Sequence, residues 1–154
     1  MASFFLDSSA VVKRYAVETG STWVSSLTEP TAGNVCWIAS VARVEILAAF
    51  YLKVRTGEVT LAQAQQAEQE FRSDLGSHFR SIAPAPAILD QAMSLVAKHP
   101  LRAYDAVQLA SALHLQSQCV ALAMPAPAFV SADQNLNRAA VAEGLSVDDP
   151  NQHP

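Results

Sequence analysis

Four carboxylates are the side chains of this 154-residue chain whose positions point to chemistry: Asp7, Glu45, Asp105 and Asp133. Carboxylate oxygens are the ligands that hard divalent cations such as Mg²⁺ and Mn²⁺ prefer. A cation held among them polarises a phosphoryl oxygen and lowers the pKa of a bound water. Clustered carboxylates also repel one another, which favours cation binding. If the fold brings these acids together, they predict a site for metal-assisted hydrolysis.

Two of the acids directly follow short apolar runs that are typical of buried strands. Asp7 comes after residues 3–6, and Asp133 comes after residues 129–132. Ligands of a parallel sheet bind beyond the carboxyl ends of its strands, so both side chains are expected at the same edge. The alternative for each is a simple helix N-cap, a position that Asp favours.

The other two acids are expected on helices. Glu45 has only apolar neighbours at helical spacing, and an unpaired carboxylate facing a core is costly. These neighbours are Val41, Ala42, Ala48 and Ala49. The alternative for Glu45 is a partly exposed seam on an apolar helix. Asp105 follows Arg102 by three residues, so its alternative is an ordinary ion pair on a helix.

Strands and helices are predicted to alternate along the chain. Apolar runs and turn residues place strands at residues 3–6, 35–38, 79–82, 129–132 and 145–147. Caps and stops place helices at residues 8–17, 21–29, 40–55, 60–75, 86–98, 101–118 and 133–144, with Ser40 and Thr60 as caps. Strands separated by helices imply parallel pairing, so the fold class is α/β.

Composition supports one domain with a sizeable core. Apolar residues make up 51% of the chain and charged residues 16%, which excludes disorder over most of its length. The net charge of −4 argues against a broad basic face for nucleic acid, so a polyanionic substrate would need a bound cation. We expect residues 1–150 to form the domain and residues 151–154 a C-terminal tail.

The sequence predicts neither a membrane span nor a secretion signal. The longest apolar stretch, residues 119–130, is twelve residues long and contains two prolines, whereas a spanning helix needs about 20 residues. No basic segment precedes the first apolar run, so a cytoplasmic protein is expected. Cys36 and Cys119 lie in apolar stretches and are interpreted as reduced core residues.

The segments around the four acids resemble those of PIN-domain proteins, specifically VapC-type toxin ribonucleases of bacterial toxin-antitoxin pairs. The resemblance is carried by FLDSS (residues 5–9), ARVEI (42–46), LRAYDA (101–106) and FVSADQNL (129–136). The segment AEGLSVDDP (142–150) is similar to the closing strand of that family. The resemblance implies a PIN-like three-layer α/β/α fold, with a central parallel sheet and helices on both faces.

The same resemblance implies an activity and a set of partners. It implies an endoribonuclease dependent on Mg²⁺ or Mn²⁺, a cognate VapB-type antitoxin, an RNA substrate and a homodimer. By position, the four acids match the acidic quartet of the family, and Ser9 and Ser131 match its hydroxyl positions. We assign Asp7 and Asp105 as direct metal ligands, and Glu45 and Asp133 as ligands through water or as activators of water.

Further roles stay open. Arg43 and Arg102 lie near Glu45 and Asp105 and are candidates for holding substrate phosphates, or are simply exposed arginines. The helices predicted at residues 40–55 and 60–75 carry a surplus of apolar residues, including Phe50 and Tyr51. They form either an antitoxin groove or ordinary core.

Two other functions are compatible with the same acids. One is a PIN-like scaffold that binds protein or RNA without cutting. The other is an Asp-based, Mg²⁺-dependent phosphotransfer domain, which predicts a partner acid beside Asp7, where Ser8 and Ser9 stand instead.

Overall fold

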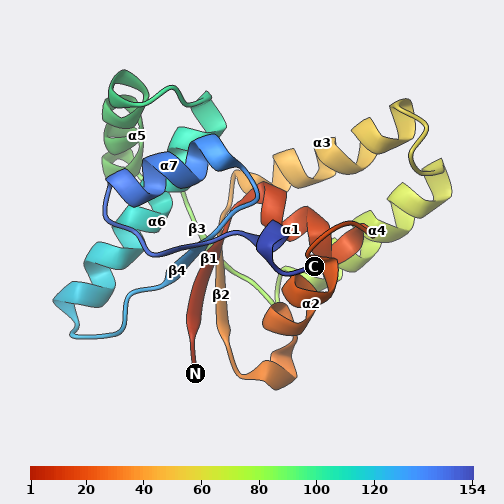
Figure 1. Cartoon of the computed structure of the whole chain (residues 1–154), viewed down its shortest axis with the longest axis horizontal. Coiled ribbons are helices and arrows are strands. Elements are labelled where there is room, and N and C mark those ends of the chain that lie inside the picture. Colours follow the sequence, from red (N-terminus) through yellow and green to blue (C-terminus); the bar gives the residue numbers. More distant parts are fainter.

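A five-stranded parallel sheet forms the centre of the computed structural model, which describes all 154 residues (Figure 1). The strands lie in the order β3-β2-β1-β4-β5 and every pair is parallel. Their bounds are β1 (Ser3–Leu6), β2 (Val35–Ala39), β3 (Arg80–Ile82), β4 (Ala128–Val130) and β5 (Val147–Asp148). The strand order reverses between β1 and β4, which is where open α/β sheets bind their ligands.

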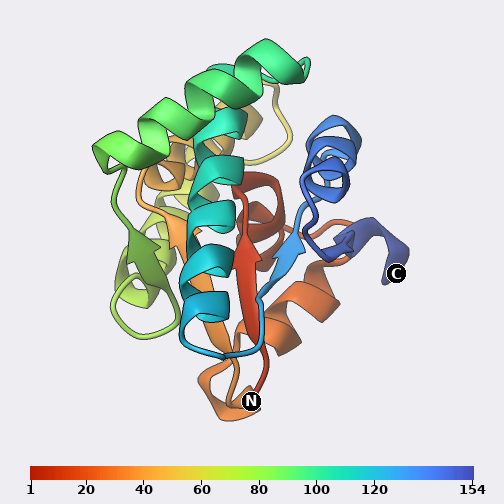
Figure 2. The same ribbon diagram turned by 90° about the vertical axis from the view of Figure 1, so that its left-hand side faces the viewer.

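Helices cover both faces of this sheet, which confirms the three-layer α/β/α class (Figures 1 and 2). One face carries α1 (Ser8–Tyr15), α2 (Ser21–Thr28), α3 (Ala42–Arg55) and α4 (Leu61–Asp74). The other carries α5 (Pro86–Lys98), α6 (Ala103–Ala121) and α7 (Gln134–Ala142). Two short 3₁₀ helices, Pro30–Ala32 and Pro150–Gln152, complete the elements.

The strands divide the core in two because successive side chains of a strand point to opposite faces. Phe5 and Phe129 point toward α5, α6 and α7, where their rings stack with centroids 5.9 Å apart. Their neighbours Leu6 and Val130 point toward α1 to α4. Both strands are therefore buried on both sides, which explains why they read as continuous apolar runs.

Local sequence signals account for several helix ends but not for the start of α3. Thr60 and Gln63 form the expected capping box at α4, and Pro86 begins α5. Ser40, however, does not cap α3, which begins at Ala42 without a side-chain cap. The Ser40 backbone N–H donates to the carbonyl of Ile82 at 2.9 Å, so the chain at Ser40 still belongs to the β2–β3 ladder.

The last residues pack onto α2. The 3₁₀ helix Pro150–Gln152 is followed by His153, whose ring stacks on Trp23 with centroids 4.0 Å apart and hydrogen-bonds Asp148. Gly20, which precedes α2, has φ of +85°, and a Cβ there would lie 2.3 Å from the carbonyl oxygen of Pro150. Only glycine fits this close approach.

Both cysteines are free and buried, as expected. None of the helices has the length and apolar character that crossing a bilayer requires.

Candidate active site

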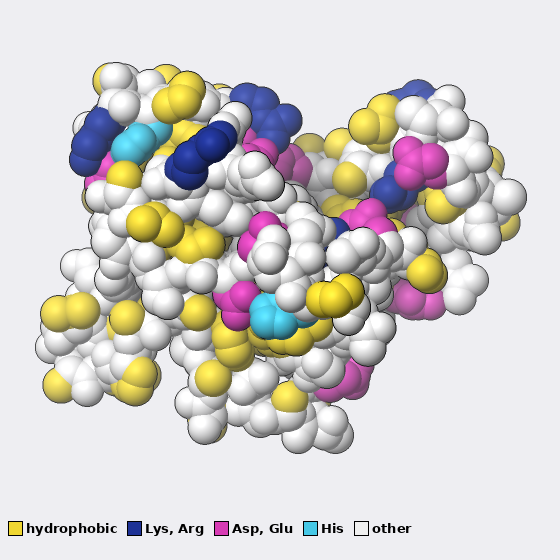
Figure 3. Space-filling model, viewed as in Figure 1, with side chains coloured by type: hydrophobic (Ala, Val, Ile, Leu, Met, Phe, Trp, Pro, Cys, Tyr) yellow, Lys and Arg dark blue, Asp and Glu magenta, His cyan; other side chains and the backbone are white.

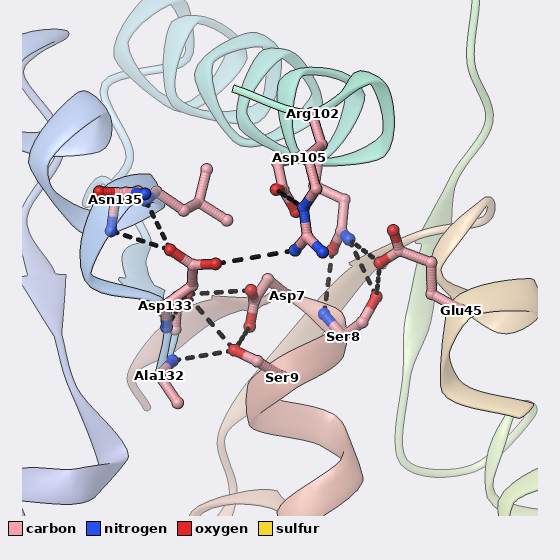
Figure 4. A network of polar contacts seen from close by, with 12 residues as sticks. Asp7, Ser8, Ser9, Glu45, Arg102, Asp105, Ala132, Asp133 and Asn135 are labelled. Atoms are coloured by element: carbon pink, nitrogen blue, oxygen red, sulfur yellow. Dashed lines mark hydrogen bonds and ion pairs between the residues drawn. The ribbon is translucent and has the colours of Figure 1, made fainter. Parts of the chain in front are cut away.

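Asp7 lies at the point where β1 passes into α1, and it is almost fully buried, with 2% of its surface exposed. One oxygen, Oδ1, caps the helix by accepting from the Ala10 backbone N–H at 2.9 Å and also accepts from Ser9 Oγ at 2.7 Å. The other, Oδ2, accepts from Ser131 Oγ at 2.9 Å. These hydrogen bonds hold both carboxylate oxygens in place (Figure 4).

Burial dominates the ionisation of Asp7. Desolvation by burial, aided to a smaller extent by the negative charge of Asp105, raises the pKa of its carboxyl from 3.8 to about 7. The hydrogen bonds from Ser9, Ala10 and Ser131 oppose this shift without cancelling it. A strongly perturbed carboxyl of this kind at a sheet edge is typical of a functional site.

Asp105 and Asp133 approach Asp7 from the opposite layer and are linked to each other by Arg102 (Figure 4). Asp105 stands in the first turn of α6 and accepts from Arg102 Nε at 2.9 Å. Asp133 follows β4, caps α7 through the N–H groups of Asn135 and Leu136, and lies 3.7 Å from an Arg102 nitrogen. Asp133 therefore caps a helix and Asp105 forms an ion pair with Arg102, as the sequence alternatives proposed. Both acids also line the cleft that contains Asp7.

Glu45 is anchored by two side chains that the sequence did not single out. Its Oε2 accepts from Ser8 Oγ at 2.6 Å and from Gln108 Nε2 at 2.8 Å. Gln108 is fully buried on α6, one turn after Asp105. A lone glutamine within the apolar run AVQLASA was the signal available for it.

All four predicted acids line one cleft of about 540 Å³. In the space-filling view the molecule is hollowed between the α3–α4 hairpin and the rest, with acidic and basic side chains on both sides (Figure 3). Four basic residues also line the cleft: Lys13, Lys53, Arg55 and Arg102. Lys13 and Lys53 both pair with Glu18, at 3.2 and 3.6 Å, whereas Arg55 forms no ion pair.

The remaining predicted residues take defined places. Ser9 and Ser131 both donate to Asp7, and Ser131 Oγ also accepts from the Asp133 backbone N–H at 3.0 Å. Arg43 lies outside the residues that line the cleft and donates to Ser81 Oγ at 2.9 Å. Its contact with substrate stays a prediction.

No three His, Cys, Asp or Glu side chains stand close enough together to form a ready-made metal site. The donor chemistry nevertheless fits a hard cation, because the four predicted acids offer only carboxylate oxygens. Arg102 forms ion pairs with Asp105 and Asp133. Its hydrogen bond to Asp105 raises the pKa of the guanidinium. The attraction of Asp133 and Glu45 adds to that shift.

Comparison with known proteins decides the family. Over 113 residues the sequence is 31% identical to Ribonuclease VapC45 and to Ribonuclease VapC49 of two Mycobacterium tuberculosis strains, covering 73% of this chain and 76% of each relative. The chain belongs to the VapC family. No family model matches the sequence.

Solved structures confirm the PIN-like fold of this VapC-family chain. The VapBC2 structure from Rickettsia felis, bound to a DNA fragment, superposes with a TM-score of 0.61 at 11% identity, covering 96% of this chain and 98% of that one. The VapC20 toxin of M. tuberculosis superposes with a TM-score of 0.59 at 14% identity, covering 92% and 95%. At these identities the likeness shows the fold alone.

Proposed function

We propose that this VapC-family protein is the endoribonuclease toxin of a toxin-antitoxin pair, acting in the cytoplasm and hydrolysing RNA with Mg²⁺ or Mn²⁺. One observation carries the proposal: four carboxylates from four separate parts of the sequence line a single cleft at the sheet edge. The relatives named ribonucleases support the same activity. Family membership leaves the phosphotransfer alternative without support.

The acids divide into two roles in this proposal. Asp7 and Asp105 hold the divalent cation directly, and Glu45 and Asp133 hold it through water or orient the attacking water. When bound, the cation supplies Lewis acidity toward a phosphoryl oxygen and makes water a better nucleophile. Asp7 is suited to a direct role because its buried negative charge lacks a basic partner in contact.

The protein's own side chains keep Asp7 oriented. The hydroxyls of Ser9 and Ser131 donate to opposite carboxylate oxygens, so rotation of the Asp7 carboxylate would break at least one hydrogen bond. Neutral donors fix the group without neutralising its charge, which leaves that charge available to a cation. This is the role we assign to the two serines.

Arg102 and Arg55 are suited to bind the RNA backbone. Arg102 is 80% exposed at its side chain, and its guanidinium lies between Asp105 and Asp133 (Figure 4). Guanidinium groups bind phosphate oxygens through paired hydrogen bonds, and such contacts position nucleic acid without reading its sequence. A phosphate near Arg102 would therefore lie beside Asp105 and Asp133.

RNA cleavage tests the proposal. Wild-type protein with Mg²⁺ or Mn²⁺ is expected to cleave total RNA, EDTA to stop it, and Asp7→Asn to lower the rate by at least about 100-fold. Asp90→Asn on the exposed side of α5 is the matched control and is expected to retain activity. Cleavage that survives EDTA or Asp7→Asn contradicts the mechanism. RNA binding without cleavage by the wild type favours the scaffold alternative.

The antitoxin is proposed to bind the α3–α4 hairpin. A second hollow of about 430 Å³ lies between this hairpin and the end of α1, and seven of its twelve lining residues are hydrophobic. Toxin-antitoxin complexes are known for the fold neighbours from Klebsiella pneumoniae and R. felis. A homodimer remains part of the proposal.

Val17, rather than Phe50 or Tyr51, is the residue that tests the antitoxin site. Phe50 lines the hollow but is only 2% exposed, so Phe50→Asp would disrupt the core. Tyr51 donates to Glu68 of α4 and does not line the hollow. Val17 is fully exposed and lines it, so Val17→Asp is expected to weaken co-purification with a VapB-type antitoxin while folding is retained. Unchanged co-purification would contradict this site.

A further inference from the structure

Gln108 is a fully buried polar side chain whose every hydrogen bond leads to the candidate active site. Its Oε1 accepts from the Ser8 backbone N–H at 3.1 Å. Its Nε2 donates to Ser8 Oγ at 2.9 Å and to Glu45 Oε2 at 2.8 Å. A buried amide is costly unless its groups are paired, so these bonds fix the orientation of the amide.

Ser8 completes a closed triangle with Gln108 and Glu45. Its hydroxyl accepts from Gln108 Nε2 and donates to Glu45 Oε2 at 2.6 Å. Glu45 Oε2 therefore accepts two hydrogen bonds from neutral donors, while Oε1 makes none within the chain (Figure 4). The anchored oxygen is turned toward α1 and α6, and the other is left for ligands in the cleft.

This triangle joins three of the elements that carry the acids. Ser8 directly follows Asp7 in sequence, Gln108 lies one helical turn after Asp105, and Glu45 is itself one of the four. Rotation of Glu45 would remove one of the two acceptors of the buried Gln108 amide nitrogen and the acceptor of the Ser8 hydroxyl. The cost of that loss favours a single rotamer of a side chain that otherwise has several.

We propose that Gln108 and Ser8 are positioning residues that fix the Glu45 carboxylate in the acidic cleft for its contact with a divalent cation or its water shell. The inference rests on the proposed metal-dependent function of this cleft. Neutral donors suit the role because they orient Glu45 and preserve its charge. Hydrogen-bond partners of metal-binding side chains typically contribute about 10- to 100-fold to metal affinity or activity.

Substitutions that remove hydrogen-bond donors but keep the size of the side chain distinguish a positioning role from a packing role. Gln108→Met keeps the length of the side chain and removes all three hydrogen bonds. Ser8→Ala removes only the hydroxyl, and Ser8→Thr restores it. Gln118→Met, at an exposed position of the same helix, is the matched control. The Glu45→Ala variant lacks the carboxylate that Gln108 and Ser8 would orient, so it serves as the background for a double-mutant comparison.

The experiment measures Mn²⁺ affinity by electron paramagnetic resonance and, in parallel, single-turnover RNA cleavage, with thermal unfolding as the check on folding. Gln108→Met and Ser8→Ala are each expected to weaken Mn²⁺ binding by about 10- to 100-fold, with Ser8→Thr recovering most of the loss. In the Glu45→Ala background the same substitutions are expected to change Mn²⁺ affinity by less than about twofold, because residues that act through one another are not additive.

Several outcomes overturn the inference. Equal losses with and without Glu45 would show that Gln108 acts through packing alone, and unchanged Mn²⁺ affinity in both single variants would show that Glu45 needs no anchor. If Gln108→Met does not fold, the Ser8→Ala and Ser8→Thr pair decides the question. Mn²⁺ binding with the expected pattern but no RNA cleavage would overturn the proposed function and leave the positioning role intact. Absence of Mn²⁺ binding by the wild type would overturn both.

Discussion

Replacing Asp7 by asparagine is expected to stabilise the metal-free fold at pH 8. Burial raises the pKa of Asp7 from 3.8 to about 7, so between these values the folded chain retains a proton that the unfolded chain loses. Stability from this group is fully present below pH 3.8, falls as pH rises, and is lost above pH 7. At 1.36 kcal/mol per pH unit, the difference between the two pKa values corresponds to about 4 kcal/mol in the free energy of unfolding.

Asparagine at this position keeps most of the local hydrogen bonds. Its Oδ1 can still accept from the Ala10 N–H and from Ser9 Oγ, and its amide nitrogen can donate to Ser131 Oγ, which lies 2.9 Å from the native Oδ2. The substitution therefore removes the buried charge and turns the Ser131 hydroxyl toward Ser9 Oγ, 3.4 Å away, as its acceptor. We expect a net gain of about 2 to 4 kcal/mol at pH 8.

Urea unfolding in EDTA at pH 5 and pH 8 measures this gain, with Asp90→Asn as the exposed control. The advantage of Asp7→Asn is expected to shrink to less than half at pH 5, because wild-type Asp7 is then protonated in the folded chain. A variant less stable than the wild type at pH 8 would refute the reasoning. So would an advantage of the same size at both pH values.

Three further predictions follow from the same contacts. Mn²⁺ binding at pH 6 is expected to release about one proton, because Asp7 must ionise to bind the ion. Calorimetry in buffers of different ionisation enthalpy measures the number of protons released. Binding without proton release would contradict the prediction. Gly20→Ala is expected to lower the free energy of unfolding by about 2 kcal/mol or more, measured by thermal unfolding, because its Cβ would meet the Pro150 carbonyl. Gly57→Ala is the control: the space around Gly57 is open, so only the strain of its positive φ lowers the stability. Equal losses of stability in the two variants would contradict the contact. Arg102→Gln, in an Asp7→Asn background, is expected to weaken RNA binding, measured by fluorescence anisotropy. The dependence of RNA affinity on salt concentration is expected to fall by the equivalent of about one phosphate contact. An unchanged salt dependence would contradict a contact between Arg102 and a phosphate.

The elements that position the site were predictable because their sequences are locally consistent. Strand β1 and helix α5 have the predicted bounds, since an apolar run before a capping Asp and a Pro at the first helical position leave little choice. The edge of the sheet was less clear. Ser40 is a plausible cap by type, but α3 begins after Val41 and Ser40 extends the pairing of β2 with β3. That pairing joins residues 42 positions apart, which local sequence does not encode.

The convergence of the four acids in one cleft was predictable from the sequence, and their hydrogen-bond partners were not. Asp7 and Asp133 follow apolar runs and Glu45 has apolar helical neighbours, which made these acids visible in the sequence. The partners Ser8 and Gln108 act across 37 to 100 residues of sequence, and only packing of α1 and α6 brings them to Glu45. The facing of Phe50 was likewise settled by tertiary packing, since an apolar triplet on a helix does not say which member points inward.

The most direct test of the acidic cleft as a metal site is anomalous diffraction from a crystal soaked in Mn²⁺. We expect a peak about 2.0 to 2.6 Å from carboxylate oxygens of Asp7 and Asp105, with the Arg102 guanidinium displaced from Asp105. The peak is expected to disappear in Asp7→Asn. No peak in the cleft, or a peak that the Asp7→Asn variant retains, would contradict the account.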